Sequence, residues 1–521
     1  MTFTVLNTLP QKRKDTVIVK TYVPGGKFAI IDENGNDVEY TIIKSRDLTD
    51  YVLSQTIMLD PSRKFYVPDQ VLEVTMAIKA NDVPALGYVQ YSIDSKKDSH
   101  KETVDKKVLE NKYYTIEVEE NGSLTIVDKA NNVTYKNQGI LVENGDDGDS
   151  FNYSPPRKDM EVFSNESKCT VKISGSDIYD QAEIHFDMVV PADLDERAEG
   201  KVSVTMPVDM TVALRKDSKV IDFNVKVDNK GLSHRLCVLF NSQIVSAFNY
   251  ADQQFGLIKR PNYYEKEMKL YMESMNNKTE KKAGIQELAN WANDQSTWQE
   301  PPISIEPTQS YVSLTDGKTG IAVIPQGVRE YEVLDDSKIR LTLFRTYGFM
   351  GKENLIYRPG RASGERIIET PAAQLLKEME FNFGFTSYAG DINDSDIDTL
   401  AKQYNTNLEV YTYAEFLNGR LIFSQREIEG QNAKIHSLFE TEGNLVVSAV
   451  KKAEEDDGYI IRLYNGKNHK NLDDKIKFNF DIKEAYYTNL KEEKTEEIKV
   501  ENNTISVKEL SHCKFVTIWV K

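Results

Sequence analysis

Apolar residues recur at every second position along much of this chain. Over residues 114–118 they alternate with polar residues, and the alternation resumes over residues 124–126, after Asn121-Gly122. A period of two places alternate side chains on one face of a strand, and Asn-Gly is typical of a type I′ turn. The segment is therefore predicted to form a β-hairpin.

Turn residues of the same kind separate other segments that are rich in Val, Ile, Thr and Tyr. They stand at Asn34-Gly35, Asp316-Gly317, Asn418-Gly419 and Asn465-Gly466. Residues 515–520 read Phe-Val-Thr-Ile-Trp-Val, which favours a last strand with both faces partly covered. The fold class that these patterns predict is all-β and mainly antiparallel.

Helical features are limited to two segments. Apolar residues between positions 397 and 404 follow the i, i+3, i+4, i+7 spacing of an amphipathic helix. Ser395 is its expected N-cap, with Asp398 as the capping-box partner. Residues 263–291 are dense in Glu, Lys, Met and Asn, which suits either a helical excursion or an exposed insert between strands.

Two stretches divide the chain into three predicted domains. The charged segment 95–107 lies between strand-rich regions and is the predicted first linker. A second boundary is predicted near residues 388–405, where the helical pattern begins. The predicted domains are residues 1–100, 101–390 and 391–521, and the last of them opens with a connector helix.

The amino-acid composition disfavours some classes of binding partner and indicates the cellular compartment. The 521 residues include 65 Lys and Arg against 82 Asp and Glu, which gives a net charge of −17. This balance disfavours nucleic acid and membrane surfaces as partners, and no segment approaches the ~18 apolar residues of a membrane span. Cys169, Cys237 and Cys513 are too far apart for a disulfide framework or paired metal ligands. With no signal-peptide pattern at the start, we expect a cytoplasmic protein.

One acidic loop combines the side chains that suit a sugar. Asp146, Asp147 and Asp149 alternate with glycines before Phe151 and Tyr153. Carboxylates accept hydrogen bonds from neighbouring hydroxyls, and aromatic rings cover the C–H face of a pyranose. A calcium-binding loop and a plain turn are the alternatives.

A second segment is rich in arginine. Arg345, Arg358, Arg361 and Arg366 stand among glycines between positions 345 and 366. Guanidinium groups fix hydroxyls and carboxylates with planar geometry. The alternative is an Arg-acid network that closes the loops of an acidic protein.

Histidines contribute less to the functional interpretation. His185 and Asp187 project from one face of a predicted strand, but a zinc site needs about three or four protein ligands and no second cluster accompanies them. His234 precedes Arg235 at the predicted start of a strand, where a structural, hydrogen-bonded histidine is favoured.

Taken in order, these segments resemble the C-terminal part of bacterial-type α-mannosidases of glycoside hydrolase family 38. The resemblance covers essentially the whole chain. It is carried by Asn7-Thr8-Leu9-Pro10, the loop 145–156, His234-Arg235-Leu236, Lys259-Arg260-Pro261, Leu343-Phe344-Arg345, Arg358-Pro359-Gly360-Arg361, Thr370-Pro371, Ser448-Ala449-Val450 and Arg462-Leu463-Tyr464-Asn465.

The resemblance implies a fold, and it implies that catalysis belongs to another domain of the intact enzyme. It implies a small β-sandwich over residues 1–100, a large galactose-mutarotase-like supersandwich over 101–390 and a terminal β-sandwich domain. In the intact enzyme it implies zinc-dependent retaining hydrolysis of α-mannosides. The zinc ligands and the nucleophile would belong to an N-terminal barrel that precedes Met1. We therefore expect no cofactor and no catalytic residue in this chain, and no activity from the chain alone.

The resemblance also implies a binding role for the two segments described above. They would border the cleft for a mannose-containing saccharide through Asp146, Asp147, Asp149, Tyr153, Arg358 and Arg361. The family pattern usually reads Asp-Glu-Tyr where this chain has Asp149-Ser150-Phe151. Phe151 lacks that hydroxyl, which argues against a direct polar contact there.

The expected partner is the N-terminal catalytic domain of the same polypeptide. Obligate interfaces are nearly as apolar as a protein core, so we expect an exposed apolar patch on the supersandwich where the catalytic domain binds. A homo-oligomer would also form through this patch. The alternative function is an autonomous carbohydrate-binding protein or a supersandwich lyase. A lyase would need Tyr, His and Arg in one groove, and the sequence places no such group at close spacing.

Overall fold

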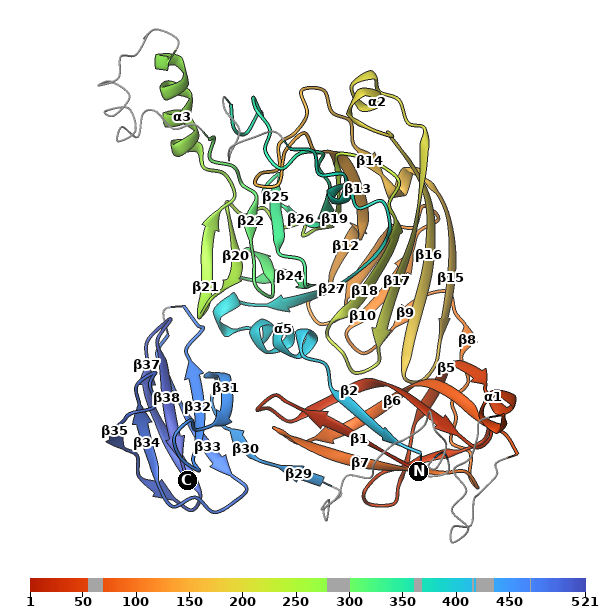
Figure 1. Ribbon diagram of the computed structural model, residues 1–521, viewed down its shortest axis with the longest axis vertical. Coiled ribbons are helices and arrows are strands. Elements are labelled where there is room, and N and C mark those ends of the chain that lie inside the picture. The colour runs from red at the N-terminus through yellow and green to blue at the C-terminus, as the bar shows by residue number, and fades with distance from the viewer. Residues whose placement is uncertain (55–68, 279–299, 360–367, 415–416, 418–434, 469) are drawn as a thin grey trace.

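The computed structural model describes residues 1–54, 69–278, 300–359, 368–414, 417, 435–468 and 470–521 (Figure 1). Every strand pair of the named strands in these residues is antiparallel, which confirms the all-β, antiparallel prediction. No helix among them combines the length and apolarity that crossing a membrane requires. Arg361 and the Asn418-Gly419 turn lie outside the described residues.

The first sandwich consists of two sheets around a shared apolar core. One sheet has the order β28 (Glu409–Tyr413), β1 (Thr2–Asn7), β7 (Gly87–Asp94), β3 (Ala29–Ile31), β4 (Asp37–Val38), with β29 (Ile435–Ser437) also paired to β7. The other has the order β2 (Arg13–Val23), β6 (Leu72–Val83), β5 (Tyr40–Asp47), followed by α1 (Thr49–Leu53). Strands β28 and β29 come from the segment between the central region and the last sandwich, far along the chain from β1 and β7.

The central region is dominated by a ten-stranded sheet. Its order is β21 (Gly256–Pro261), β20 (Phe248–Gln253), β23 (Val312–Thr315), β24 (Thr319–Gln326), β27 (Glu378–Ala389), β18 (Ile221–Asp228), β17 (Val204–Arg215), β16 (Tyr179–Val190), β15 (Lys168–Gly175), β8 (Val104–Asp105). Strand β8 lies within the predicted linker 95–107 and forms the edge of this sheet.

Two further sheets complete the central region. The six-stranded sheet has the order β14 (Val162–Phe163), β13 (Ile140–Gly145), β19 (His234–Asn241), β26 (Lys338–Arg345), β25 (Glu330–Leu334), β22 (Glu306–Pro307). The four-stranded sheet has the order β12 (Val133–Gln138), β11 (Leu124–Asp128), β10 (Tyr114–Val118), β9 (Leu109–Glu110). One apolar cluster joins all three sheets, with Phe223 stacked on Phe383 and Phe240 on Phe385.

The hairpin β10–β11 forms as predicted, but its turn is of a different type. Val118 pairs with Leu124, and the amide of Glu119 donates to Ser123 O at 2.9 Å. Gly122 has φ +80°, whereas Asn121 is not among the residues with positive φ. A type I′ turn requires positive φ at both central residues. Three residues rather than two close this hairpin, so the type I′ prediction is wrong.

Helices occupy only a small part of the chain. Besides α1, the helices of the described residues are α2 (Leu194–Glu199), α3 (Glu265–Lys278), α5 (Ile397–Asn405) and the 3₁₀ turns Ser164–Glu166, Pro371–Gln374 and Ile392–Asp394. Helix α3 is the described part of segment 263–291, and the remainder from residue 279 lies outside the described residues. Figure 1 shows α5 at the junction of the central region with the other two parts of the chain.

The connector helix forms over the predicted positions but with a different N-terminus. Asp396, not Ser395, is the N-cap residue, and its side chain makes no capping bond. Asp398 instead accepts a hydrogen bond from Tyr311 OH at 2.5 Å and pairs with Lys467. Tertiary contacts thus recruit the carboxylate that the predicted capping box would have used locally. Ile397 and Ala401 are buried against the central sheet.

The last part of the chain forms a second two-sheet sandwich around its own core. One sheet has the order β30 (Phe439–Thr441), β33 (Leu472–Phe478), β37 (Thr504–Leu510), β36 (Val500–Glu501). The other has the order β31 (Val446–Lys452), β32 (Tyr459–Tyr464), β38 (Phe515–Val520), β34 (Ala485–Thr488), β35 (Lys494–Glu497). Strand β38 forms as predicted and is buried from Val516 to Val520, which is more complete than the partial coverage that its sequence indicated.

Candidate functional site

The acidic loop follows β13, which ends at Gly145, and lies against the segment that follows β26. Arg345 Nε donates to Asp146 Oδ2 at 2.6 Å, and Arg345 Nη2 donates to Asp146 Oδ1 at 3.2 Å. The same guanidinium also donates to the carbonyl oxygens of Asp149 and Asn152, at 2.9 and 2.8 Å. One arginine, whose side chain is only 18% exposed, thereby fixes both ends of the loop, because its planar donors match several acceptors at once.

Asp149 and Arg358 form a second buried pair. Their side chains are 0% and 4% exposed. Asp149 also accepts backbone N–H bonds from Lys352 at 2.8 Å, Phe151 at 3.0 Å and Asn152 at 3.2 Å. Burial opposes the negative charge, but the hydrogen bonds from Arg358 and these amides prevail and lower the pKa of Asp149. The carboxylate is therefore ionised and fully engaged by protein groups.

The other predicted residues of the loop differ in exposure. Asp147 pairs with Lys352 near the surface, where its side chain is 27% exposed. Tyr153 is buried, its ring lies 3.8 Å from the guanidinium carbon of Arg235, and its hydroxyl accepts from Asn144 Nδ2 at 3.0 Å. Burial is the main cause that raises the pKa of Tyr153, so the phenol stays neutral.

The structure thus brings the loop and Arg358 together, on one side of the central region. Their proposed contact with a sugar stays a prediction. In this structure the carboxylates of Asp146 and Asp149, the hydroxyl of Tyr153 and the two terminal nitrogens of Arg358 bind neighbouring loop and strand groups. Arg361 lies outside the described residues.

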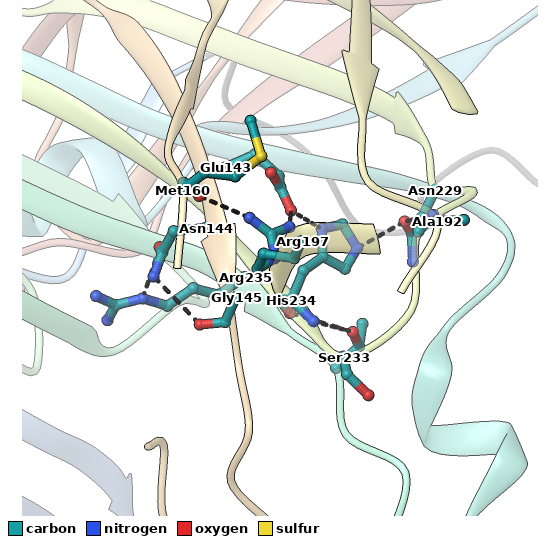
Figure 2. Close-up of polar contacts among 12 residues, drawn as sticks. Glu143, Asn144, Gly145, Met160, Ala192, Arg197, Asn229, Ser233, His234 and Arg235 are labelled. Atoms are coloured by element: carbon teal, nitrogen blue, oxygen red, sulfur yellow. Dashed lines mark hydrogen bonds and ion pairs between the residues drawn. The ribbon is translucent and has the colours of Figure 1, made fainter. Parts of the chain in front are cut away.

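A buried polar cluster lies beside the loop, and sequence reasoning identified only its histidine. Figure 2 shows Glu143 between Arg197 and His234. His234 Nδ1 lies 3.0 Å from Glu143 Oε1, and its Nε2 lies 2.9 Å from Asn229 Oδ1. Arg197 Nη1 donates to Met160 O at 2.7 Å. The one sequence feature that pointed to Glu143 is a charged residue in the otherwise apolar start of strand β13.

Hydrogen-bond directions determine where one proton of this cluster lies. Asn229 Nδ2 donates to the carbonyl oxygens of Gln374 and Leu375, and Asn229 Oδ1 accepts from the Gly231 amide. The oxygen of Asn229 therefore faces His234, and His234 Nε2 must carry a proton.

The cluster is closed to solvent. Glu143, Arg197, Asn229 and His234 are each at most 2% exposed. Substrate cannot reach them, so their role is to fasten α2 to strands β13 and β19 beneath the loop. His234 is the buried, hydrogen-bonded histidine that the sequence favoured.

His185 lies in a different environment, on the outer face of the large sheet. Its Nδ1 lies 2.7 Å from Asp209 Oδ1 across the paired strands, and its Nε2 lies 3.4 Å from Asp187 Oδ1. The hydrogen bond to Asp209 is the largest cause that raises the pKa of His185. Among the described residues, no three His, Cys, Asp or Glu side chains gather to hold a metal ion.

Comparisons with known proteins place the chain among glycoside hydrolases. Residues 109–349 match the Glycosyl hydrolases family 38 C-terminal domain. Residues 444–517 match the Glycosyl hydrolases family 38 C-terminal beta sandwich domain. A protein of Halalkalibacterium halodurans named as a mannosylglycerate hydrolase is 24% identical over 420 residues, covering 77% of this chain and 40% of that protein.

Solved structures show the same fold. A family 38 glycosyl hydrolase from Enterococcus faecalis has a TM-score of 0.73 at 18% identity, covering 100% of this chain and 58% of that one. An alpha-mannosidase from Enterococcus faecalis V583 has a TM-score of 0.73 at 19% identity, covering 100% and 56%. The chain thus spans less than two thirds of these proteins. Its two matched regions exceed half of its own length, and it belongs to glycoside hydrolase family 38, as a C-terminal portion of that family's proteins.

Proposed function

We propose that this chain is the non-catalytic C-terminal portion of a cytoplasmic, zinc-dependent retaining α-mannosidase. In this role it supports the catalytic barrel and forms one wall of the sugar cleft. The observation that carries the proposal is the match to both C-terminal domains of family 38, in a chain that spans 40% of the curated relative. The proposal assigns catalysis to the portion of the relatives that this chain does not span.

Zinc does not fit the described residues of this chain, because they contain no group of three metal-ligating side chains. His185 has two carboxylate neighbours, but both bind it as hydrogen-bond partners in an exposed cross-strand group. We therefore place the zinc of the intact enzyme in its N-terminal domain. No step of the chemistry is assigned to a metal held here.

An exposed apolar patch supports the scaffolding role. Phe151, Met350 and Ile368 are 58%, 47% and 49% exposed. Their segments are joined, because Ser150 Oγ donates to Met350 O at 2.6 Å and the Met350 amide donates to Ile368 O at 2.8 Å. Large apolar side chains gathered on loop tips mark interaction surfaces. We propose that the catalytic domain of the same polypeptide covers this patch.

The loop gives this surface a fixed shape beside the cleft. We assign positioning to Asp146, Asp149, Arg358 and the buried Tyr153, whose contacts hold the loop. We assign contact with the saccharide to Asp147, which is the partly exposed carboxylate of the loop. Arg361 is proposed to act with it on the sugar hydroxyls. Carboxylate and guanidinium groups orient hydroxyls and do not cleave the glycosidic bond in this arrangement.

The proposed substrate class is α-mannosides, from the names of the relatives. One is named an alpha-mannosidase and another a mannosylglycerate hydrolase. The cytoplasmic assignment is supported by the free thiols of Cys169, Cys237 and Cys513. The lyase alternative is disfavoured by the geometry, since Arg235 and Tyr153 contact each other but are buried, and His234 is buried as well.

The test compares the purified chain with an intact family 38 polypeptide that contains it. Both are assayed with p-nitrophenyl α-D-mannopyranoside and analysed for zinc. We expect the chain alone to show neither stoichiometric zinc nor turnover, and the intact polypeptide to show turnover that a chelator abolishes. Chelator-sensitive turnover by the chain alone would contradict the proposal.

A matched pair of variants tests the patch. In the intact polypeptide, Phe151→Asp should weaken docking of the two parts and lower activity. Leu490→Asp, at an apolar residue of the terminal sandwich that is 63% exposed, should leave activity unchanged. Equal effects of the two changes would exclude a specific docking surface at Phe151.

A further inference from the structure

A hollow of about 450 Å³ lies at the junction of the first sandwich and the central region, away from the acidic loop. One wall comes from β2 and β5. The other comes from the outer face of β16, β17, β18 and β27, together with the C-terminal end of α5. Small-molecule sites favour domain junctions and commonly measure ~300–1,000 Å³. The size and location of this hollow thus fit a ligand of one or two sugar units.

A chain of alternating charges lines its base. Arg13 Nη2 donates to Asp15 Oδ2 at 3.0 Å, and Arg215 pairs with the other oxygen of Asp15. Arg215 also donates to both oxygens of Asp222, at 2.9 and 3.1 Å. The positive charges of the two guanidinium groups balance the negative charges of the two carboxylates, so the base has no net charge that would attract an ion. A neutral, polar ligand is the class that such a lining favours.

Several polar side chains of the hollow have no protein partner. Among the described residues, the hydroxyls of Tyr179 and Tyr404 and the amide of Gln326 make no hydrogen bond. Burial raises the pKa of both phenols, so they remain neutral and can donate as well as accept. Phenol and amide groups both donate and accept hydrogen bonds, as sugar hydroxyls do, so they are suited to bind such hydroxyls.

The backbone beneath Tyr404 is shaped to receive its ring. Gly384 of β27 lies under the ring, and a Cβ at that position would come within 2.6 Å of Val220 Cγ1 and within 3.2 Å of the ring. The absence of a side chain lets the helix place this aromatic ring directly on the sheet, at the hollow. An aromatic ring beside free hydroxyl and amide groups is the combination that binds the C–H and O–H faces of a pyranose.

We propose that this hollow is a second saccharide-binding site, for a neutral mono- or disaccharide. A second depression on the same sheet shares Thr211 and Asn224 with it and is also lined by His185. Further sugar units of a longer glycan would lie along this surface. The site would anchor a glycan remote from the cleft that the catalytic domain completes. The inference does not rest on the proposed function, because no loop residue contributes to it.

The test uses the full chain and two neutral probes, methyl α-D-mannopyranoside and methyl α-D-glucopyranoside, in calorimetric and saturation-transfer NMR titrations. We expect saturable binding of at least one probe. Removing one hydrogen-bonding group with Tyr404→Phe or Gln326→Ala should weaken it about three- to tenfold. Tyr459→Phe, at an exposed tyrosine of the terminal sandwich, should change nothing. Thermal unfolding of each variant confirms that it is folded.

Three outcomes would overturn the inference. The first is the absence of saturable binding of either probe to the unaltered chain. The second is binding that Tyr404→Phe and Gln326→Ala leave unchanged but Asp147→Asn abolishes, which would move the site to the loop. The third is tighter binding of mannose 6-phosphate than of the neutral glycosides, which would contradict the neutral class of ligand.

Discussion

Replacing Asp149 with alanine tests whether the loop is held by its buried ion pairs. The substitution removes a carboxylate that is 0% exposed and leaves Arg358, which is 4% exposed, without its partner. It also leaves the amides of Phe151, Asn152 and Lys352 without their acceptor. Unpaired buried charge is costly, because the protein interior cannot replace the lost hydration.

The expected cost follows from the burial of the pair. Removing one partner of a buried, hydrogen-bonded ion pair lowers the free energy of unfolding by about 3–5 kcal/mol. For a cooperative unit of roughly 150–250 residues each kcal/mol lowers Tm by ~2–4 °C, so the unfolding transition of the central region should fall by about 6–20 °C. Asp147→Ala is the matched control. Its pair with Lys352 is partly exposed, so its cost should stay within ~1 kcal/mol.

Calorimetry and urea titration at neutral pH measure both variants. The pKa of Asp149 is lowered in the folded chain, so its stabilising contribution is present above the unfolded pKa of ~3.9 and is lost as pH falls through the folded value. The difference in free energy of unfolding between the unaltered chain and Asp149→Ala should therefore become smaller at acidic pH. Equal, small effects of Asp147→Ala and Asp149→Ala would refute the reasoning. That result would instead favour Asp149 as a residue that is free to bind the substrate.

Two further predictions concern other polar groups. Glu143→Leu should lower the free energy of unfolding by about 3–5 kcal/mol in a urea titration, because it leaves Arg197 and His234 buried without their shared acceptor; a loss below ~1 kcal/mol would show that the cluster does not need that carboxylate. Asp209→Asn should lower the pKa of His185 toward 6.5 in an NMR titration, because the bond to Asp209 raises it. That bond stabilises the fold below the unfolded pKa, and the contribution is lost as pH rises through the folded pKa; an unchanged titration of His185 would contradict the assignment.

The sequence by itself determined the local elements. Period-two alternation placed β10, β11 and β38, and helical spacing placed α5. The composition of the acidic loop and the arginines after β26 identified the segment where charged groups gather. These features are readable because strand and helix patterns depend on residues that are neighbours in sequence.

The tertiary structure decided which distant groups meet. It paired β1 with β28 across about 400 residues, and it brought Arg358 to Asp149 and Arg197 to Glu143. It also converted Asp398 from an expected helix cap into a partner of Tyr311, and it created the hollow between β2 and the large sheet. None of these features follows from local pattern, because their residues are far apart in sequence. For the ion pairs, the chain has many acidic residues, and each of them is a possible partner for a given arginine as long as both remain in water. Only the folded packing, in which an unpaired charge is costly, selects one partner for each.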